Sequence, residues 1–357
     1  MTVLFSSLLR WLVLALAVGA AGCGSQPAAP DGPPAGRAFY YWRTTFALTP
    51  VEVRALAELH VDRLYLRMFD VAWDDALNAP SVLGAVALTP GARVPAGVEV
   101  VPVVFLRDAV FRHLGTDGSA ALARRTWEQV KARTAALGAA PRELQVDCDW
   151  TDSSRDSYFE FVRALRAESH LALSATIRLH QVKYRERTGI PPIDRGMLMF
   201  YNMGQIAADP AARAIFDPAR AQKYLARVRD YPLPLDVALP IWSWTVHLRD
   251  DRVEGLLQST DPDELAALPF LRRTASDHYV ATRTAFLHGT LLREGDVLKV
   301  EVTGPDQALA AAAMIAPRLA RTPAGGPART LSLFELSERN LTRHGHDHLE
   351  QLFRAVR

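Results

Sequence analysis

The feature that most constrains the fold is a regular alternation, beyond residue 37, of short apolar runs with longer helical patterns. Eight runs have the length of a strand, and helical segments lie between most of them. This alternation is typical of a parallel sheet with helical connections, and eight strands predict an α/β fold, a (β/α)8 TIM-type barrel. The predicted strands are 38–45, 61–69, 98–106, 143–149, 171–178, 196–202, 235–244 and 330–336.

The seventh and eighth predicted strands are far apart in the chain. Residues 245–329 between them contain a short helix, an antiparallel-looking pair of strands and an Ala-rich helix. We interpret 245–329 as a subdomain inserted between strands 7 and 8 of a barrel that extends over 37–357. The alternative is that 271–329 forms a small separate β-rich domain. The helices predicted for the barrel itself are 50–59, 119–137, 155–168, 218–229 and 345–356.

The N-terminus resembles a bacterial lipoprotein signal. Arg10 precedes an apolar run too short to span a bilayer comfortably, and small residues then lead to Cys23. We therefore expect residues 1–22 to be a signal peptide, Cys23 to carry lipid, and 23–36 to include a flexible tether rich in Pro, Gly and Ala. This predicts a protein of the bacterial cell envelope, lipid-anchored on the periplasmic face of the outer membrane. A plain signal peptide cut nearby, or an uncleaved anchor, are the alternatives.

The charge balance and the motifs exclude several function classes. The chain has 41 Lys and Arg against 39 Asp and Glu, so nucleic acid is not expected as a partner, and the membrane is expected to be contacted only through the lipid. No phosphate-binding Gly-rich loop and no nucleophile elbow is present, and we predict no cofactor. The run from His344 to His348 could hold a metal for a hydrolase. It starts the last helix, where polar residues cap, so we predict no metal site.

Side-chain alternation along the strands indicates which residues face the barrel interior. In the fourth predicted strand the apolar residues take the helix side, so Gln145, Asp147 and Asp149 point inward. Barrel active sites lie at the C-terminal ends of the strands, where these residues are placed. The same argument assigns to the interior, on the second and fifth strands, Tyr65, Arg67, Phe69, Arg178 and His180.

Asp147 and Asp149 carry the sharpest chemical signal. Two carboxylates on one face of a strand, two residues apart, are separated by ~7 Å. Their repulsion would raise the pKa of one of them and keep it protonated near neutral pH. This is the profile of a general acid for a glycosidic oxygen, with Asp149 as the acid and Asp147 as its partner. The alternative is a pair that binds a cation, Arg178 or Arg67 without catalysis.

Tryptophans gather at the predicted C-terminal ends of the strands, where indole rings could stack on sugar rings. They are Trp42, Trp73, Trp150, Trp242 and Trp244. The alternative is that they pack loops onto the barrel mouth. Arginines at strand ends could bind a carboxylate or an acidic sugar, or form structural ion pairs. Glu335 is a possible second carboxylate, although its parity places it on the helix side. The predicted substrate-binding residues are Arg43, Arg67, Trp150, Arg178, His180, Tyr201, Asn202, Trp242, Trp244 and Glu335.

Two short motifs resemble the family-18 glycoside hydrolases, which are chitinase-like barrels. That family carries DxDxE on strand four, and this chain has Asp147 and Asp149 there. The resemblance allows two alignments. In the first, Asp149 takes the acid position as Asp and Gln145 replaces the first Asp. In the second, Asp147 and Asp149 are the two Asp, and the acid position holds Thr151, which would inactivate the site by that mechanism.

The family's MxYD motif on strand six corresponds here to Met199 through Asn202. The resemblance implies that Met199 and Tyr201 match directly and that Tyr201 contacts the reacting sugar, whereas Asn202 replaces an Asp. Over most of the chain the sequence more closely resembles an uncharacterised family of bacterial lipoproteins with a glycosidase-like barrel. The segments LQVDCDWT, LSATIRLHQVKYR and DRGMLMFYNMG carry this resemblance.

We therefore expect an envelope-anchored glycoside hydrolase-like protein that cleaves or binds a glycan. The alternative is a non-catalytic glycan-binding lipoprotein on a degenerate barrel, which the Gln145 and Asn202 departures favour. The sequence leaves both open, so we do not predict from it whether the chain is an enzyme.

Overall fold

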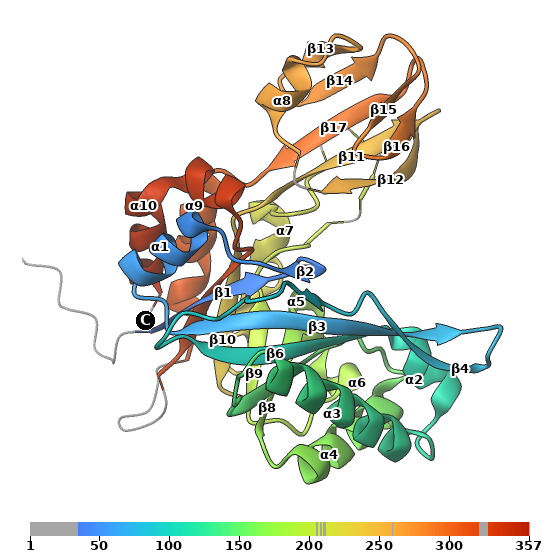
Figure 1. Cartoon of the computed structure of the whole chain (residues 1–357), viewed down its shortest axis with the longest axis vertical. Coiled ribbons are helices and arrows are strands. Elements are labelled where there is room, and N and C mark those ends of the chain that lie inside the picture. Colours follow the sequence, from blue (N-terminus) through green and yellow to red (C-terminus); the bar gives the residue numbers. More distant parts are fainter. Residues whose placement is uncertain are drawn as a thin grey trace, which may run out of the picture. The chain divides into compact units, whose positions relative to one another are not determined.

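A computed structural model describes residues 35–204, 206–207, 209, 212–258, 260–320 and 328–356 (Figure 1). The predicted signal peptide, Cys23 and most of the predicted tether lie outside these residues. Within the described ranges, no helix has the length and apolar character needed to cross a membrane.

The centre of the fold is a closed barrel of parallel strands (Figure 1). Each strand pairs with its neighbours in the order β1-β18-β10-β9-β8-β7-β6-β3, and pairing of β1 with β3 closes the ring. This confirms the (β/α)8 barrel expected from the sequence, with the insertion between its seventh and eighth strands. The barrel strands are β1 (Gly36–Tyr41), β3 (Arg63–Asp74), β6 (Glu99–Leu106), β7 (Glu143–Asp147), β8 (Ala172–Arg178), β9 (Arg195–Met199), β10 (Leu235–Pro240) and β18 (Thr330–Phe334).

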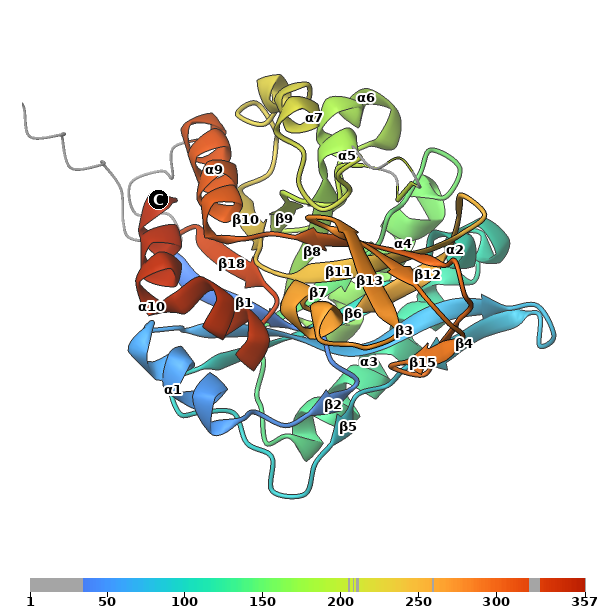
Figure 2. The same ribbon diagram turned by 90° about the horizontal axis from the view of Figure 1, so that it is seen from above.

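Helices connect most of these strands and cover the outside of the barrel (Figure 2). The first begins as the sequence indicates: the Thr49 hydroxyl accepts the Glu52 N–H, the Glu52 carboxylate accepts the Thr49 N–H, and Pro50 occupies the first turn. The connecting helices are α1 (Pro50–Glu58), α2 (Asp108–Leu114), α3 (Ser119–Ala136), α4 (Arg155–Ser169), α5 (Leu179–Lys183), α6 (Arg185–Thr188), α7 (Pro218–Gln222), η1 (Leu225–Arg227), α9 (Pro305–Ile315), η2 (Ala316–Arg318) and α10 (Glu338–Ala355).

The connection from β3 to β6 is built differently. The end of β3 extends into an antiparallel hairpin with β4 (Ala79–Leu83), and β2 (Thr45–Phe46) pairs in parallel with β5 (Ala87–Leu88). In the described part of this connection there is no helix, which explains why the sequence pattern is unclear there.

The strand parity is confirmed for β7. Leu144 and Val146 are fully buried on the helix side, whereas Gln145 lies inside the barrel. There it accepts a hydrogen bond from the Tyr40 hydroxyl at 2.5 Å and donates one to Ser174 at 3.2 Å. Both the oxygen and the nitrogen of the Gln145 side chain are thus hydrogen-bonded inside the barrel, which offsets most of the free-energy cost of burying a polar group.

The parity prediction is wrong at the end of the second barrel strand. A bulge in β3 makes Met68 an extra residue, because Arg67 pairs with Val103 and Phe69 with the very next residue of β6. Phe69 therefore faces outward, where the Arg133 guanidinium of α3 lies 5.2 Å from its ring centroid. The same shift turns Asp70 toward the interior.

The insertion forms a second, antiparallel sheet with its own apolar core around Leu265, Tyr279 and Leu298. It begins at Ser243, so Trp244, expected on the seventh barrel strand, belongs instead to the inserted sheet. Its elements are β11 (Ser243–Arg249), β12 (Arg252–Gln258), α8 (Pro262–Ala266), β13 (Leu271–Ala275), β14 (His278–Ala281), the hairpin β15 (Ala285–Leu287) and β16 (Thr290–Leu292), and β17 (Val297–Val302).

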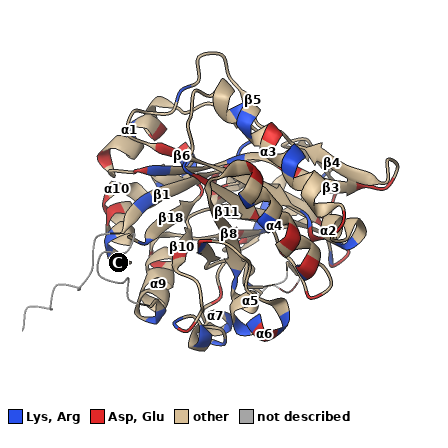
Figure 3. Cartoon of the chain, turned by 90° about the horizontal axis from the view of Figure 1, so that it is seen from below, with Lys and Arg blue, Asp and Glu red and all other residues tan. Residues whose placement is uncertain are grey.

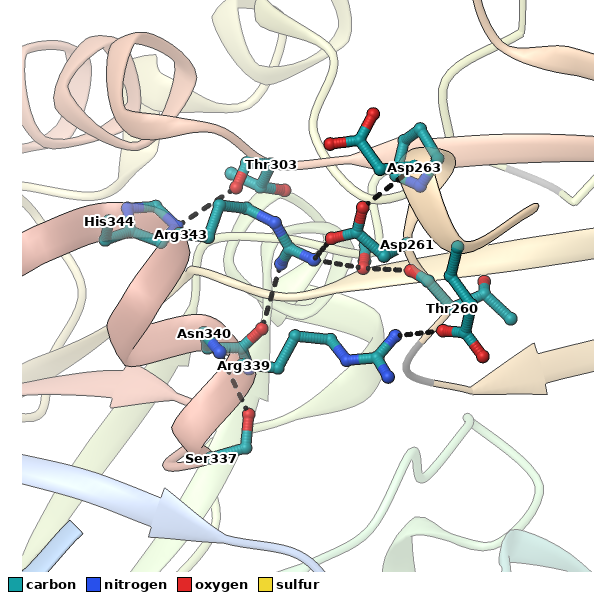
Figure 4. A network of polar contacts seen from close by, with 12 residues as sticks. Thr260, Asp261, Asp263, Thr303, Ser337, Arg339, Asn340, Arg343 and His344 are labelled. Atoms are coloured by element: carbon teal, nitrogen blue, oxygen red, sulfur yellow. Dashed lines mark hydrogen bonds and ion pairs between the residues drawn. The ribbon is translucent and has the colours of Figure 1, made fainter. Parts of the chain in front are cut away.

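Helix α10 holds the insertion through a polar network (Figure 4). Arg343 donates to Asp261 at 3.3 Å, and Arg339 pairs with Glu264 at 3.0 Å. The His344 ring lies 3.1 Å from the carbonyl oxygens of both Ile241 and Thr303. His344 therefore has a structural role at this junction.

Candidate active site

A cavity of about 880 Å³, which we call the main cavity, opens at the C-terminal ends of the barrel strands. Its volume is within the range of small-molecule sites, and this end of a TIM barrel carries the active site in characterised enzymes. The residues that line it are Trp42, Arg43, Thr44, Thr45, Ala47, Arg67, Asp70, Phe105, Asp147, Arg178, Met199, Tyr201, Asn202, Trp242, Trp244, Phe334 and Glu335.

Asp147 is the carboxyl group at the inner end of the main cavity. It is the last residue of β7 and only 4% exposed. The Thr176 hydroxyl on the neighbouring strand donates to its Oδ1 at 2.6 Å, and Arg178 Nη2 lies 3.6 Å from the same oxygen. Burial raises the pKa of Asp147 to about 6, the Arg178 cation opposes this rise, and the negative charges of Asp149 and Asp70 add to it. Asp147 can therefore hold a proton close to neutral pH.

Asp149 lies beyond the end of β7, and half of its side chain is exposed. Its Oδ1 accepts a hydrogen bond from Arg178 Nε at 2.5 Å. It faces a second cavity of about 360 Å³, and it does not line the main one. The two carboxyls predicted to act together are thus separated by the Arg178 side chain. Burial opposes the charge of Arg178, but Asp149 and Asp147 hold its pKa above the usual value.

An aromatic wall, formed by Trp42, Tyr201, Trp242, Trp244 and Phe334, stands on one side of the main cavity. The Phe334 ring centroid lies 5.0 Å from that of Trp242, 5.4 Å from Tyr201 and 5.6 Å from Trp42. The indole N–H of Trp244 is buried and, in the described ranges, has no hydrogen-bond partner. The wall therefore offers flat apolar faces to the main cavity, which suits a sugar ring.

Glu335 also lines the main cavity, so the parity argument that placed it on the helix side is wrong. The reason is that β18 ends at Phe334, and the alternation of the strand no longer applies to the next residue. Burial raises the pKa of Glu335 to about 7, and the nearby Arg43 cation opposes this rise.

The arginines of the main cavity all form ion pairs within the chain. Arg43 contacts the buried Glu52 at 2.8 Å, and Arg67 contacts Asp70 at the same distance. Together with the Arg178–Asp149 pair, these contacts match the structural ion-pair alternative for the strand-end arginines. An acidic ligand would have to compete with carboxylates already in place.

Two tryptophans expected at the rim lie elsewhere. Trp150 is fully buried, because its ring stacks on Tyr158 at 5.0 Å and its N–H donates to the Thr188 carbonyl at 2.8 Å. The structure therefore places it in the core, away from both cavities. Trp73 lies on the extension of β3 and stacks on His113 at 4.8 Å. Both tryptophans therefore pack against other side chains of the fold, which agrees with the alternative that they have a packing role and do not bind sugar.

The remaining predicted residues lie at the boundary of the two cavities. Arg178, Tyr201 and Asn202 line both of them, and His180 lines the second. Thr151, the acid position in one alignment of the family motif, also faces the second cavity, and its hydroxyl lies 3.1 Å from that of Ser153. If that alignment applies, the motif supplies no acid there.

Sequence reasoning missed Phe334 and Phe105. The alternation that puts Leu331 and Leu333 outside would have placed Phe334 inside, so a signal for it was present. Phe105 lies beside Asp147 in the sheet register and lines the cavity, but its apolar strand carries no local mark of this position. Thr44, Thr45 and Ala47 also line the cavity; they lie in and beside β2, which is only two residues long and too short to show an alternation.

Potential metal ligands do not gather in the structure. Throughout the described residues, no group of three or more His, Cys, Asp or Glu side chains could hold a metal ion.

Charged residues of both signs are interspersed over the helices visible in Figure 3.

Comparison with known proteins supports the fold. No family model and no curated protein matches the sequence. Among solved structures, the spore cortex-lytic enzyme SleL of Bacillus megaterium QM B1551 is similar with a TM-score of 0.55 and 11% identity, over 92% of this chain and 76% of that one. SleL of Bacillus cereus gives 0.51 and 12%, with the same coverage.

The C-terminal domain of a putative chitinase from Desulfitobacterium hafniense DCB-2 gives a TM-score of 0.51 and 9% identity, over 90% of this chain and all of that domain. At such low identity these similarities concern the fold alone. The chain thus has the same parallel-barrel fold as these proteins.

Proposed function

We propose that this protein is a glycoside hydrolase-like protein that binds a glycan in the main cavity and cleaves it with Asp147 as proton donor. The observation that carries the proposal is a buried carboxyl group, its pKa raised to about 6, beside an aromatic wall at the C-terminal end of the barrel. Two of the structural neighbours are a spore cortex-lytic enzyme and a putative chitinase, which agrees with this class of reaction.

The aromatic wall positions the sugar. Trp242, Trp244 and Phe334 line the main cavity with aromatic rings on which a sugar ring can stack. Protonated Asp147 then transfers its proton to the glycosidic oxygen as the bond from that oxygen to the anomeric carbon breaks, while the Thr176 hydroxyl fixes the orientation of the carboxyl. A water molecule adds to the anomeric carbon and releases a proton to solvent, from which Asp147 is protonated again. Burial favours the protonated form that this step needs.

The sequence prediction gives the acid role to Asp149. The geometry supports Asp147 better, because Asp149 is half exposed, pairs with Arg178 and faces the second cavity. In this proposal Asp149 is a positioning residue that holds the guanidinium away from Asp147.

Glu335 is not placed to act as a nucleophile beside Asp147. Glu335 directly follows β18, which is four positions from β7 in the eight-stranded ring, so the two carboxyls come from opposite sides of the barrel. A retaining pair needs a separation of about 5 Å. We therefore assign Glu335, like Asp70, to ligand binding.

A second candidate function is glycan binding without cleavage. The observation that favours it is the position of Arg178, whose guanidinium contacts both Asp147 and Asp149 and stabilises the ionised form of Asp147. In that case the aromatic wall would bind a sugar, and Asp147 would accept a hydrogen bond from it.

One experiment separates these possibilities. Wild type, Asp147→Asn and Asp149→Asn are incubated with a panel of polysaccharides, including chitin and bacterial peptidoglycan, and new reducing ends are measured. Loss of cleavage in Asp147→Asn, with partial activity in Asp149→Asn, is the expected result. The reverse pattern would assign the acid role to Asp149. If all three proteins bind an oligosaccharide and none of them cleaves it, the enzyme function is refuted and glycan binding is the only one of the two functions that remains.

The envelope location is part of the same proposal and rests on the N-terminal sequence. Cys23→Ser in the full-length chain is expected to move the protein from the membrane fraction to the soluble periplasmic fraction and to abolish incorporation of labelled fatty acid. Unchanged membrane association without label would indicate an uncleaved anchor.

A further inference from the structure

One carboxyl group of the main cavity, that of Glu335, is unpaired. It lines the cavity, and it forms no hydrogen bond or ion pair with any residue that the structure describes. The other two lining carboxyls have partners within the chain, because Asp147 accepts a hydrogen bond from Thr176 and Asp70 pairs with Arg67. Glu335 is therefore the acidic group of this cavity that is available to a ligand.

The main cavity also contains more acidic groups than cations. Three arginines and three carboxyl groups line it, and two of these arginines pair with carboxylates that do not line it, Glu52 and Asp149. Within the described part of the chain, five acidic groups thus share three guanidiniums. Burial raises the pKa of Glu335 to about 7, because a charge at this position is costly without a counter-ion. A cationic group of a ligand would supply that counter-ion.

The groups that face Glu335 do not neutralise it. Arg43 is the cation whose charge acts on it, but Arg43 Nη2 donates to both carboxylate oxygens of Glu52 at 2.8 Å, and Glu52 adds a negative charge. The Glu335 charge also acts on Tyr41 and Tyr201, whose pKa values are raised by burial, so both hydroxyls stay neutral. A negative charge on Glu335 is thus largely uncompensated by the described residues.

The backbone holds Glu335 beside the aromatic wall. The preceding residue, Phe334, belongs to the wall, and its carbonyl accepts the Ile241 N–H at 2.9 Å. The Glu335 carbonyl accepts a hydrogen bond from the Asn340 amide at 3.0 Å. A carboxylate next to aromatic faces suits an ammonium group, because the carboxylate forms an ion pair with the cation and the ring faces attract it.

We infer that the main cavity is specific for a cationic glycan, which contains sugars with a free, protonated amino group, and that Glu335 is the residue that binds this ammonium. The inference rests on the proposed glycan-binding function and specifies the class of its substrate. The sugar ring stacks on the aromatic wall, and its amino group meets Glu335. A sugar that carries a carboxylate is disfavoured, because the lining arginines are already paired.

The test compares two ligands that share one backbone and differ at the amino group: the β-1,4-linked hexasaccharide of glucosamine, and the same hexasaccharide after chemical N-acetylation. Binding at pH 7 is measured by calorimetry with Asp147→Asn, which prevents cleavage, and with Glu335→Gln added to it. Loss of the ion pair is expected to weaken binding of the cationic hexasaccharide about tenfold and to leave binding of the acetylated one unchanged. Glu338→Gln is the matched control, because Glu338 is exposed and does not line the cavity.

Proton release provides a measurement that does not depend on the folding of Glu335→Gln. An ion pair that strengthens binding tenfold lowers the pKa of Glu335 by about one unit. At pH 6 the unbound carboxyl is mostly protonated, so the cationic hexasaccharide should release part of a proton from Asp147→Asn and the acetylated one none. Calorimetry in buffers of different ionisation enthalpy measures this release.

Three results would overturn the ammonium site while the proposed function stands. They are equal weakening of both hexasaccharides by Glu335→Gln, equal affinity of Asp147→Asn for the two ligands, and binding of the cationic ligand without proton release. Absence of binding of either hexasaccharide would also overturn it. The proposed function would fail together with it only if the polysaccharide panel showed neither cleavage nor binding.

Discussion

Replacement of Asp147 by Asn should stabilise the protein at alkaline pH while it abolishes cleavage. Burial raises the pKa of Asp147 from its usual value near 3.8 to about 6, so ionisation in the folded chain above pH 6 costs about 3 kcal/mol. Because the folded pKa lies above the unfolded one, the favourable contribution of the protonated group is complete below pH 4 and is lost as the pH rises through 6. Asn cannot ionise, and it still accepts the Thr176 hydrogen bond.

The variant is therefore expected to match wild type at pH 4 and to exceed its free energy of unfolding by about 3 kcal/mol at pH 8. For a domain of this size the difference corresponds to a rise of about 4–5 °C in Tm. Urea unfolding followed by tryptophan fluorescence at pH 4, 6 and 8 measures the difference. Asp152→Asn, at an exposed position that lines neither cavity, is the control without a gain at pH 8. A variant no more stable than wild type at pH 8, or a gain that is the same at all three pH values, would refute the reasoning.

Three further substitutions probe other parts of the site. Burial raises the pKa of Glu335 from its usual value near 4.5 to about 7, so the gain in stability of Glu335→Gln should be absent at pH 4, grow from about pH 4.5 and reach its full size only above about pH 7, one unit above the limit for Asp147→Asn; unfolding at pH 4 to 9 checks this. Trp244→Phe shortens one ring of the aromatic wall, so sugar binding should weaken in calorimetry. It also removes a buried N–H without a partner in the described structure, which offsets part of the lost packing, and the unfolding free energy should fall by no more than about 1 kcal/mol. Trp150→Phe loses the hydrogen bond to Thr188 and should lower the free energy of unfolding by about 1–3 kcal/mol without changing the affinity of the folded protein for sugar. A loss of sugar affinity as large as the loss of stability would show that Trp150 contributes to the binding site.

The barrel could be predicted from the sequence because its signals are local. Each strand is a short run whose apolar residues face the helices, as Leu144 and Val146 do, and its ends are marked by turn and capping residues such as Thr49. The bulge at Met68 could not be predicted, because it depends on how β3 pairs with β6, a contact between segments more than thirty residues apart.

The site was predictable where a residue belongs to a strand and less so beyond the strand end. Asp147, the last residue of β7, lies in the main cavity as parity indicates. Asp149, Trp150 and Glu335 follow strand ends, where alternation no longer fixes the direction of a side chain. Their positions are set by tertiary partners instead: Arg178 for Asp149, and Tyr158 for Trp150.

The charge balance around Arg178 decides how well Asp147 can serve as an acid. The guanidinium donates to Asp149 at 2.5 Å and reaches Asp147 at 3.6 Å, so Asp149 both repels a negative charge on Asp147 and competes for the cation that would stabilise that charge. Both effects raise the pKa of Asp147, so removing the Asp149 charge is expected to lower it. If Asp147 is the acid, Asp149→Asn should therefore move the alkaline limb of the kcat/KM profile to lower pH while activity persists below that limb. A limb at unchanged or higher pH would show that Asp149 does not act through Arg178. Complete loss of activity at every pH, in a folded protein, would instead make Asp149 the acid.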